Sequence, residues 1–350
     1  MDHDDPDEDL TPPDDGSEAK VRICPPGPGF LAAVGWVAVL IVVQVVLGVA
    51  LAIAALIAGV DAGLPMIAVA VTGNLIVAAL IVGFAYGASG REKLAVRSPG
   101  ATRLLCVFAL ALPLLLVVGE ASEWLADACR AVGVPNGLIE IWGQNEIIEA
   151  IGRMDPVAGT ISVIIFGALF PALGEELLFR GYIGRGLVAR WGVWKGILLT
   201  SLLFGAVHIH PLHAVVAAFL GVILHTVYLW TRSLIAPMLL HGINNYAAIQ
   251  IPVSAKHGQL PLATEAHLPP LLVLTALLAV LGIGFLLYRS RVRWALADGT
   301  DWSPGFATAE TPPPSVGARP DARPIGLRMG VVVVWLYSLF GFVLWCELSR

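Results

Sequence analysis

The chain has 350 residues, of which 57% are hydrophobic and only 13% are charged, and its formal net charge is −5. The mean hydropathy of +0.81 excludes a soluble globular domain and predicts an integral membrane protein. We therefore expect the lipid bilayer to be a partner and expect no nucleic-acid partner. The net charge says little more, because most of it comes from one terminal segment.

That segment is residues 1–28, which we expect to be a disordered, acidic, cytoplasmic tail. Nine acidic residues lie within its first 20 positions, with proline and glycine and almost nothing apolar between them. No basic stretch precedes the first apolar run, so we expect that run to be a retained helix and not a cleaved signal peptide.

Apolar runs long enough to cross a bilayer, which needs roughly 20 residues per helix, recur along the rest of the chain. They predict an all-α, polytopic transmembrane bundle of about eight to nine helices. The runs are residues 30–60, 65–88, 104–119, 157–178, 196–212, 213–230, 233–251, 269–288 and 326–346. We divide the chain into N-terminal helices with an external loop (29–156), a central segment (157–251), and C-terminal helices (252–350) with a flexible proline-rich linker at about 289–325.

The placement of arginine and lysine predicts the orientation of the helices. Basic residues cluster at 91–103, at 180–195, at Arg232 and at 289–293, and each cluster falls on the same side if the spans alternate. The connection 119–156 is poor in basic residues and should face outward. We therefore expect a multi-pass protein of the cell membrane with a cytoplasmic N-terminus, and the composition suggests a bacterial inner membrane.

Two adjacent carboxylates stand at the end of the run from Val157 to Gly174, which has no ionisable side chain. Charged groups in such a place are costly in a bilayer and are tolerated when they face a cavity, pair with a cation or do chemistry. On a helix, Glu176 and Arg180 share a face and should pair, whereas Glu175 is turned by about 100°. Glu175 would then meet water or a metal, while Glu176 is held ionised.

Two further polar groups fall in apolar runs. His208 follows an apolar stretch, and a neutral imidazole there could bind a metal or accept a proton. His241 and Asn245, four residues apart on one helical face, could hold a developing oxyanion or orient a water or metal. His210 and His213 should lie nearer a turn, exposed, and His225 has no polar partner nearby in sequence.

Each of these groups also has a purely structural interpretation. Glu176 with Arg180 could be a structural ion pair, His208 a hydrogen-bonded core histidine, and His241 with Asn245 a contact between helices. Two carboxylates, two histidines and an asparagine on three apolar helices favour a functional site instead. The four cysteines have no CxxC spacing, so we expect neither a zinc ribbon nor a disulfide framework.

Three ordered motifs carry a family resemblance. The sequence Glu-Glu-Leu-Leu-Phe-Arg-Gly at 175–181, then Phe204-x-x-x-His208, then His241-x-x-x-Asn245, resembles the CPBP intramembrane proteases, which include type II CAAX prenyl endopeptidases and bacterial Abi proteins. The turn at 231–234 also resembles the family pattern. The resemblance covers roughly 157–251, under a third of the chain.

The resemblance implies that Glu175 and His208 activate the attacking water, that His241 and Asn245 stabilise the tetrahedral oxyanion, and that Glu176 and Arg180 support them. It also implies a possible zinc ion with Glu175, His208 and His241 as ligands, which the sequence does not decide. There is no HExxH helix. Alternating spans place Glu175 and His208 at opposite ends of their helices, so one of these helices must be irregular if the motifs meet.

From these residues we predict an intramembrane endopeptidase that cleaves a membrane-associated peptide or protein. The alternatives are a non-catalytic immunity or scaffold protein of the membrane and an ion-coupled transporter. The sequence predicts neither the substrate, prenylated or not, nor the oligomeric state.

Overall fold

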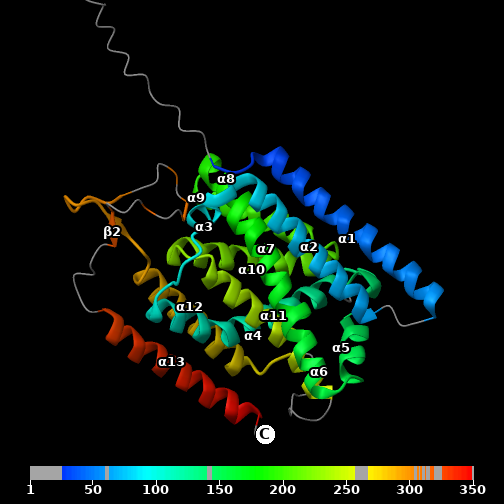
Figure 1. The fold of residues 1–350 in the computed structure, drawn as a ribbon. Helices are drawn as coiled ribbons and strands as arrows, with labels where there is room; N and C mark the ends of the chain where they lie inside the picture. Colours follow the sequence, from blue (N-terminus) through cyan, green and yellow to red (C-terminus); the bar gives the residue numbers. More distant parts are fainter. Residues whose placement is uncertain are drawn as a thin grey trace, which may run out of the picture.

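The computed structural model describes residues 26–59, 63–139, 144–256, 267–302, 306, 308–309, 312, 316–318 and 325–348. Most of the predicted acidic tail, and part of the predicted proline-rich linker, therefore lie outside the described residues. The described chain is a bundle of helices, which confirms the predicted all-α fold (Figure 1).

The helices follow one another with short connections. Their bounds are α1 Phe30–Ala58, α2 Gly63–Tyr86, α3 Gly90–Lys93, α4 Ala101–Ala131, α5 Gln144–Gly152, α6 Pro156–Ser162, α7 Phe170–Glu176, α8 Gly184–Trp191, α9 Val193–Ala206, α10 Pro211–Thr231, α11 Ile235–Lys256, α12 Pro270–Arg289 and α13 Ile325–Leu348. Two short 3₁₀ turns, η1 Gly87–Ser89 and η2 Asn136–Leu138, and two π-helical segments, η3 Val163–Leu169 and η4 Leu177–Ile183, complete the helical structure. A two-residue strand β1, Trp294–Ala295, pairs antiparallel with β2, Gly317–Ala318.

Within the described residues, six helices are long and apolar enough to cross a membrane, as expected of a multi-pass protein. This number is lower than the eight or nine spans that the sequence predicted. The other three predicted spans are the helices α9, α11 and α13. The first has only 14 residues, and the apolar part of α13 is Val332–Cys346. Histidine, asparagine and lysine side chains lower the mean hydropathy of α11.

The fourth span differs most from its prediction. We expected it to end near residue 178, with Arg180 and Arg185 in a basic connection, but the helix runs without a break from Pro156 to Trp191. Asp155 caps its start by accepting hydrogen bonds from two backbone N–H groups, and Gly192 ends it at φ +79°. Both arginines are consequently inside the protein, at 1% exposure each.

Three helices lie at the centre of the bundle (Figure 1). In Figure 1, α7, α10 and α11 lie in the middle, with α1 along one side and α13 along the other. The largest cluster of buried apolar side chains joins α4, α10, α11 and α12, and a second joins α1 and α2 to the helices from η4 to α10. Close approach of α9 and α10 depends on Gly205, where a Cβ would overlap the carbonyl oxygen of Ala214.

The basic connections meet at one end of the bundle, which we call the basic end. Hydrogen bonds join the Leu234 amide to the Ala95 carbonyl (3.0 Å) and the Val292 amide to the Trp230 carbonyl (2.9 Å). The Arg103 side chain donates to the Ser290 carbonyl at 2.6 Å. The described part of the 289–325 connection is therefore packed against the bundle, where we expected a flexible linker.

The opposite end, which we call the acidic end, carries a histidine held by two carboxylates. His267 Nδ1 lies 2.9 Å from Glu120 Oε1, and its Nε2 lies 2.9 Å from Asp127 Oδ2. A carboxylate only accepts, so both ring nitrogens donate and the imidazole is protonated in this contact. These hydrogen bonds, first to Asp127 and then to Glu120, raise the pKa of His267 above its ordinary value.

We expect this contact to make stability depend on pH. A raised folded-state pKa means that the stabilisation is complete below the ordinary histidine pKa of about 6.5 and is lost as the pH rises through the raised value. The unfolding temperature of the purified protein should thus fall more steeply between pH 6 and 9 than that of His267→Gln. Parallel curves for the two proteins would contradict the assignment. The effect should be modest, because the side chain is 38% exposed.

Candidate active site

The site is built first on the middle of the long helix, where Glu176 and Arg180 pair. Arg180 Nη1 lies 2.7 Å from Glu176 Oε1, and the two side chains are 1% and 0% exposed. The spacing of four residues therefore produces the predicted ion pair. Because neither charge reaches solvent, each depends on the other and on further hydrogen bonds for its stability.

Arg180 also connects the long helix to its neighbours. Its Nη2 donates to the Gly221 carbonyl of α10 at 3.1 Å. Its guanidinium lies over the ring of Phe204, in α9, at 4.5 Å from the ring centroid. The arginine thus fixes three helices relative to one another around the carboxylate of Glu176.

His241, on α11, lies between the two adjacent carboxylates. Its Nδ1 is 2.9 Å from Glu176 Oε1, and its Nε2 is 3.7 Å from Glu175 Oε2. Since the carboxylate of Glu176 accepts, Nδ1 must carry the hydrogen. Nε2 therefore faces Glu175, at a distance too long for a direct hydrogen bond.

His208 lies in the turn between α9 and α10. Its Nδ1 is 2.9 Å from the Phe204 carbonyl, one of the last carbonyls of α9, which lack partners within the helix. A carbonyl can only accept, so Nδ1 donates and Nε2 is left as the basic nitrogen. The next residue, Ile209, has φ +60°, a conformation that is costly for a β-branched side chain and that marks a strained turn.

Phe204 separates the two histidines. Its ring centroid lies 5.1 Å from that of His208 and 5.8 Å from that of His241, and both contacts are edge-on. The phenylalanine is 1% exposed. It is therefore a rigid apolar wall that sets the positions of both imidazoles and of Arg180.

The structure places a further histidine here that sequence reasoning assigned to an exposed turn. The ring of His213 lies 4.5 Å from that of His208, and His213 interacts electrostatically with Glu175. The side chain of His210 is also buried, at 3%, and its Nδ1 accepts from the His213 amide at the start of α10. The sequence signal for this was Pro211, which begins α10 between His208 and His213.

The two asparagines of α11 differ in their surroundings. Asn244 is buried and donates to the Leu240 carbonyl of its own helix at 3.0 Å, not to a neighbouring helix. Asn245 is half-buried, one turn beyond His241, and its side chain makes no hydrogen bond among the described residues. Its amide is therefore available to a ligand. His225, elsewhere in α10, is buried against Gly184 and Tyr228.

The lengths of the helices resolve the predicted conflict of depth. Because the fourth span continues to Trp191, Glu175 lies deep in its helix and not at the end. Gly192 forms the turn between the long helix and α9, and α9 stops at Ala206. The number of residues from Gly192 to His208 is therefore about the same as the number from Glu175 to Gly192. The two motifs therefore reach the same level from opposite sides of the turn.

Two carboxylate oxygens in this arrangement, Glu175 Oε2 and Glu176 Oε2, are buried and make no hydrogen bond among the described residues. The side chain of Glu175 as a whole is 23% exposed, whereas that of Glu176 is fully buried. Glu175 is thus the carboxylate that an incoming water or substrate can reach, and an unpaired buried acceptor of this kind calls for such a partner.

Comparison with known proteins identifies the segment that contains the site. Residues 157–247 match the family of type II CAAX prenyl endopeptidases, Rce1-like. The match covers about a quarter of the chain and contains all three motifs, which confirms the resemblance and places this Rce1-like segment in a family of CAAX-type proteases. No curated protein and no solved structure matched the chain.

An apolar groove of about 400 Å³ adjoins two of the three motifs of the Rce1-like segment. It runs between the long helix and α11. Its walls include Ala172 and Leu173, directly before the two carboxylates, and Gly242, directly after His241. A ligand in this groove would place its apolar part beside the polar groups of the site.

The zinc ligands implied by the resemblance do not form a metal site in this arrangement. Among the described residues, no three histidine, cysteine, aspartate or glutamate side chains are grouped closely enough to hold a metal ion. In the Rce1-like segment, His241 Nε2 and Glu175 Oε2 are 3.7 Å apart, while Glu176 holds the other nitrogen of His241. We therefore derive no step of the reaction through a metal.

Proposed function

We propose that the chain is an intramembrane endopeptidase that hydrolyses a peptide bond in a membrane-associated protein or peptide. The observation that carries this proposal is the buried, unpaired Oε2 of Glu175, which faces a histidine within the Rce1-like segment. Peptide hydrolysis needs a water, a base and an oxyanion partner in a polar site within the protein.

In the proposed reaction, Glu175 and His208 activate the water. The water donates one hydrogen bond to the free oxygen of Glu175 and one to Nε2 of His208, which its Nδ1–H bond to Phe204 leaves basic. Glu175 takes the proton as the oxygen attacks the scissile carbonyl carbon. It then returns the proton to the leaving amine, so the carboxylate is regenerated.

The developing oxyanion is assigned to His241 and Asn245. Because Nδ1 of His241 already donates to Glu176, His241 can donate to an oxyanion only from Nε2, as an imidazolium. The carboxylates of Glu175 and Glu176 lie beside the two nitrogens of that ring, at 3.7 Å from Nε2 and 2.9 Å from Nδ1. The free amide of Asn245 supplies the second donor, and Arg180 holds Glu176 in place.

Cleavage by the purified protein tests the proposal. The protein in liposomes should cut a membrane-anchored peptide, and His208→Ala should reduce the rate by roughly 10²-fold or more because one of the two groups that activate the water is lost. His267→Gln, at the acidic end, is the matched control and should retain full activity at pH 8. Undiminished cleavage by a correctly folded His208→Ala protein would rule the mechanism out.

The proposed mechanism needs no metal. We therefore expect cleavage to continue when a strong chelator is present, and we expect metal analysis of active protein to find less than one zinc ion per chain. Loss of activity with chelator and its recovery with zinc would overturn this part, and would make Glu175, His208 and His241 ligands.

We assign the apolar groove to the apolar part of the substrate, whether an isoprenoid or a transmembrane segment. A Cβ at Gly242 would lie 3.8 Å from Ala172 Cβ, an ordinary contact, so Gly242→Ala should be tolerated. Gly242→Leu should fill the groove and lower kcat/KM by roughly tenfold or more. Matched prenylated and unprenylated peptides, assayed with both variants, show which apolar group the groove accepts. Equal activity of the two variants would remove the groove from substrate binding.

For orientation, we propose that the basic end faces the cytoplasm of a bacterial cell and that the acidic end faces outward. The clustering of three basic connections, at 91–103, at Arg232 and at 289–293, at one end supports this placement. Accessibility of single cysteines introduced at 97 and at 153 to an impermeant thiol reagent, in intact and in opened cells, tests it. Labelling of position 97 from outside intact cells would reverse the orientation.

A further inference from the structure

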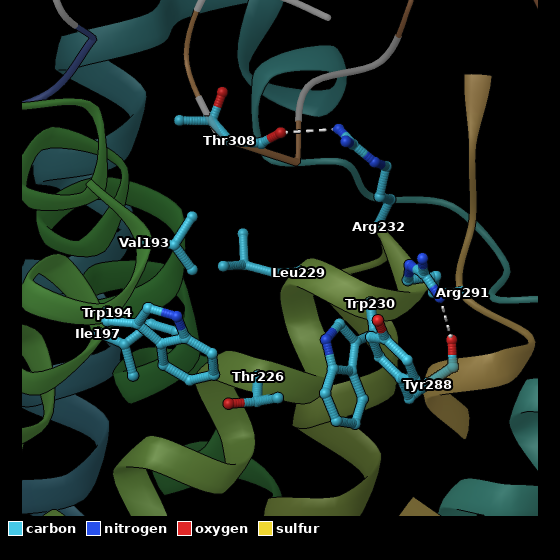
Figure 2. Close-up of a pocket in the computed structure, with 10 residues that line it drawn as sticks. All are labelled: Val193, Trp194, Ile197, Thr226, Leu229, Trp230, Arg232, Tyr288, Arg291 and Thr308. Carbon is cyan, nitrogen blue, oxygen red and sulfur yellow. Dashed lines mark hydrogen bonds between the residues drawn. The ribbon is translucent and has the colours of Figure 1, made fainter. Parts of the chain in front are cut away.

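A second cavity, separate from the Rce1-like motifs, opens at the basic end. It has a volume of about 250 Å³ and lies between the start of α9, the end of α10 and the end of α12. Figure 2 shows the ten residues that line it. None of these ten is acidic, and two of them are the arginines Arg232 and Arg291. The cavity is therefore positively charged at one side and apolar elsewhere.

The walls of this cavity carry aromatic residues from helix ends. Trp194 lies in the first turn of α9, Trp230 in the last turn of α10 and Tyr288 in the last turn of α12. The rings of Trp230 and Tyr288 are in edge contact, with centroids 5.3 Å apart. Tryptophan and tyrosine at the ends of apolar helices mark the boundary between hydrocarbon and headgroups. The cavity thus lies at the level of the lipid phosphates.

Its polar atoms are only partly satisfied. Arg232, in a left-handed conformation at φ +46°, donates from Nη1 to the Thr308 carbonyl at 2.8 Å (Figure 2). Its buried Nε and the buried hydroxyl oxygen of Thr308 have no hydrogen-bond partner among the described residues. Arg291 donates to the Tyr288 carbonyl at 3.0 Å and stacks over that ring. Donors remain on both arginines for an anionic oxygen.

An apolar track leads from the cavity along the outside of the bundle. Three exposed apolar side chains lie on one face of α9 at intervals of four residues. They are Trp194, Leu198 and Leu202, and they are 73%, 54% and 54% exposed. An acyl chain can lie along this stripe from the level of the headgroups toward the centre of the bilayer. The cavity and the stripe together match an amphipathic anion.

We propose that this cavity binds the phosphate of an anionic phospholipid. Arg232 and Arg291 contact the phosphate oxygens, the Thr308 hydroxyl donates to the headgroup, and one acyl chain lies along Trp194, Leu198 and Leu202. A basic pocket between helix ends is a recognised setting for phospholipid headgroups. The inference is independent of peptide cleavage.

Lipid binding by the full-length protein tests this. In nanodiscs of phosphatidylcholine with increasing phosphatidylglycerol, native mass spectrometry of the released protein should show retained phosphatidylglycerol. With about 1 kcal/mol expected per arginine, Arg232→Gln/Arg291→Gln should weaken retention roughly 30-fold. Arg293→Gln, an exposed arginine outside the cavity, is the matched control and should bind as the parent does.

A further variant and a competition experiment also test lipid binding. If the double variant does not fold, Thr226→Phe fills the cavity while both arginines remain, and it should also abolish retention. Glycerol 3-phosphate and inorganic phosphate should displace the lipid only weakly, because they lack the acyl chain. Unchanged retention in folded double-variant or Thr226→Phe protein would overturn the proposal, as would tight binding of inorganic phosphate without binding of the lipid.

Discussion

Glu175→Gln should reduce the rate of peptide cleavage by roughly 10²- to 10⁴-fold while the fold and the binding of substrate are retained. Glutamine keeps the size and the hydrogen-bonding capacity of the side chain but cannot take a proton from water. Because Glu175 Oε2 makes no hydrogen bond among the described residues, the substitution at this oxygen breaks no hydrogen bond. The rate constant kcat, measured with a membrane-anchored peptide in liposomes, is the readout.

The matched control is Glu123→Gln, a half-buried carboxylate on α4 near the acidic end. It should leave kcat unchanged. A Glu175→Gln protein that cleaves at the parent rate would show that this carboxylate is not the base. If alanine at Glu175, His208 and His241 left the biological phenotype of the protein intact in cells, the non-catalytic alternative would gain support.

Glu176→Gln should lower the free energy of unfolding by about 3–5 kcal/mol. The change removes one charge from a pair that is fully buried, and Arg180 is left without its counter-charge. Unfolding of the purified protein in detergent measures the loss. The same substitution at Glu149, whose contact with Lys256 is about half exposed on both sides, should have only a small fraction of that effect.

A double variant separates charge from shape in this pair. Glu176→Gln/Arg180→Met removes both charges and should recover most of the lost stability, because a buried pair can often be replaced by neutral groups. Cleavage should nevertheless stay at least tenfold below the parent, because the carboxylate that accepts from Nδ1 of His241 and so orients its ring is absent. Full recovery of both properties would reduce Glu176 to a structural role.

Much of this could be predicted because hydropathy and helical spacing act locally. The apolar runs predicted the helices, since a bilayer leaves few alternatives to them. The interval of four residues predicted the pair of Glu176 and Arg180, which depends only on the geometry of one helix. The roles of Glu175, His208, His241 and Asn245 remain predictions.

The rest depended on contacts between helices. The sequence predicted a basic connection that contains Arg180 and Arg185. In the structure, Arg180 pairs with Glu176 and Arg185 lies over the ring of Tyr86, so the helix continues through both arginines. Two π-helical segments, before and after the carboxylates, also shift the register of the long helix. His213 joins the site only because α9 stops early and α10 turns back.

The short helix α9 has a consequence for how the site obtains its water. Fourteen residues span about 21 Å, less than the roughly 30 Å of hydrocarbon, so a helix that starts at the Trp194 interface ends inside the membrane. The turn that follows presents backbone groups that lipid cannot satisfy, and such a turn survives only where protein or an aqueous cavity surrounds it. The break that places His208 therefore lies where protein or water must surround the backbone, and an aqueous cavity there would also supply the water that the proposed hydrolysis consumes.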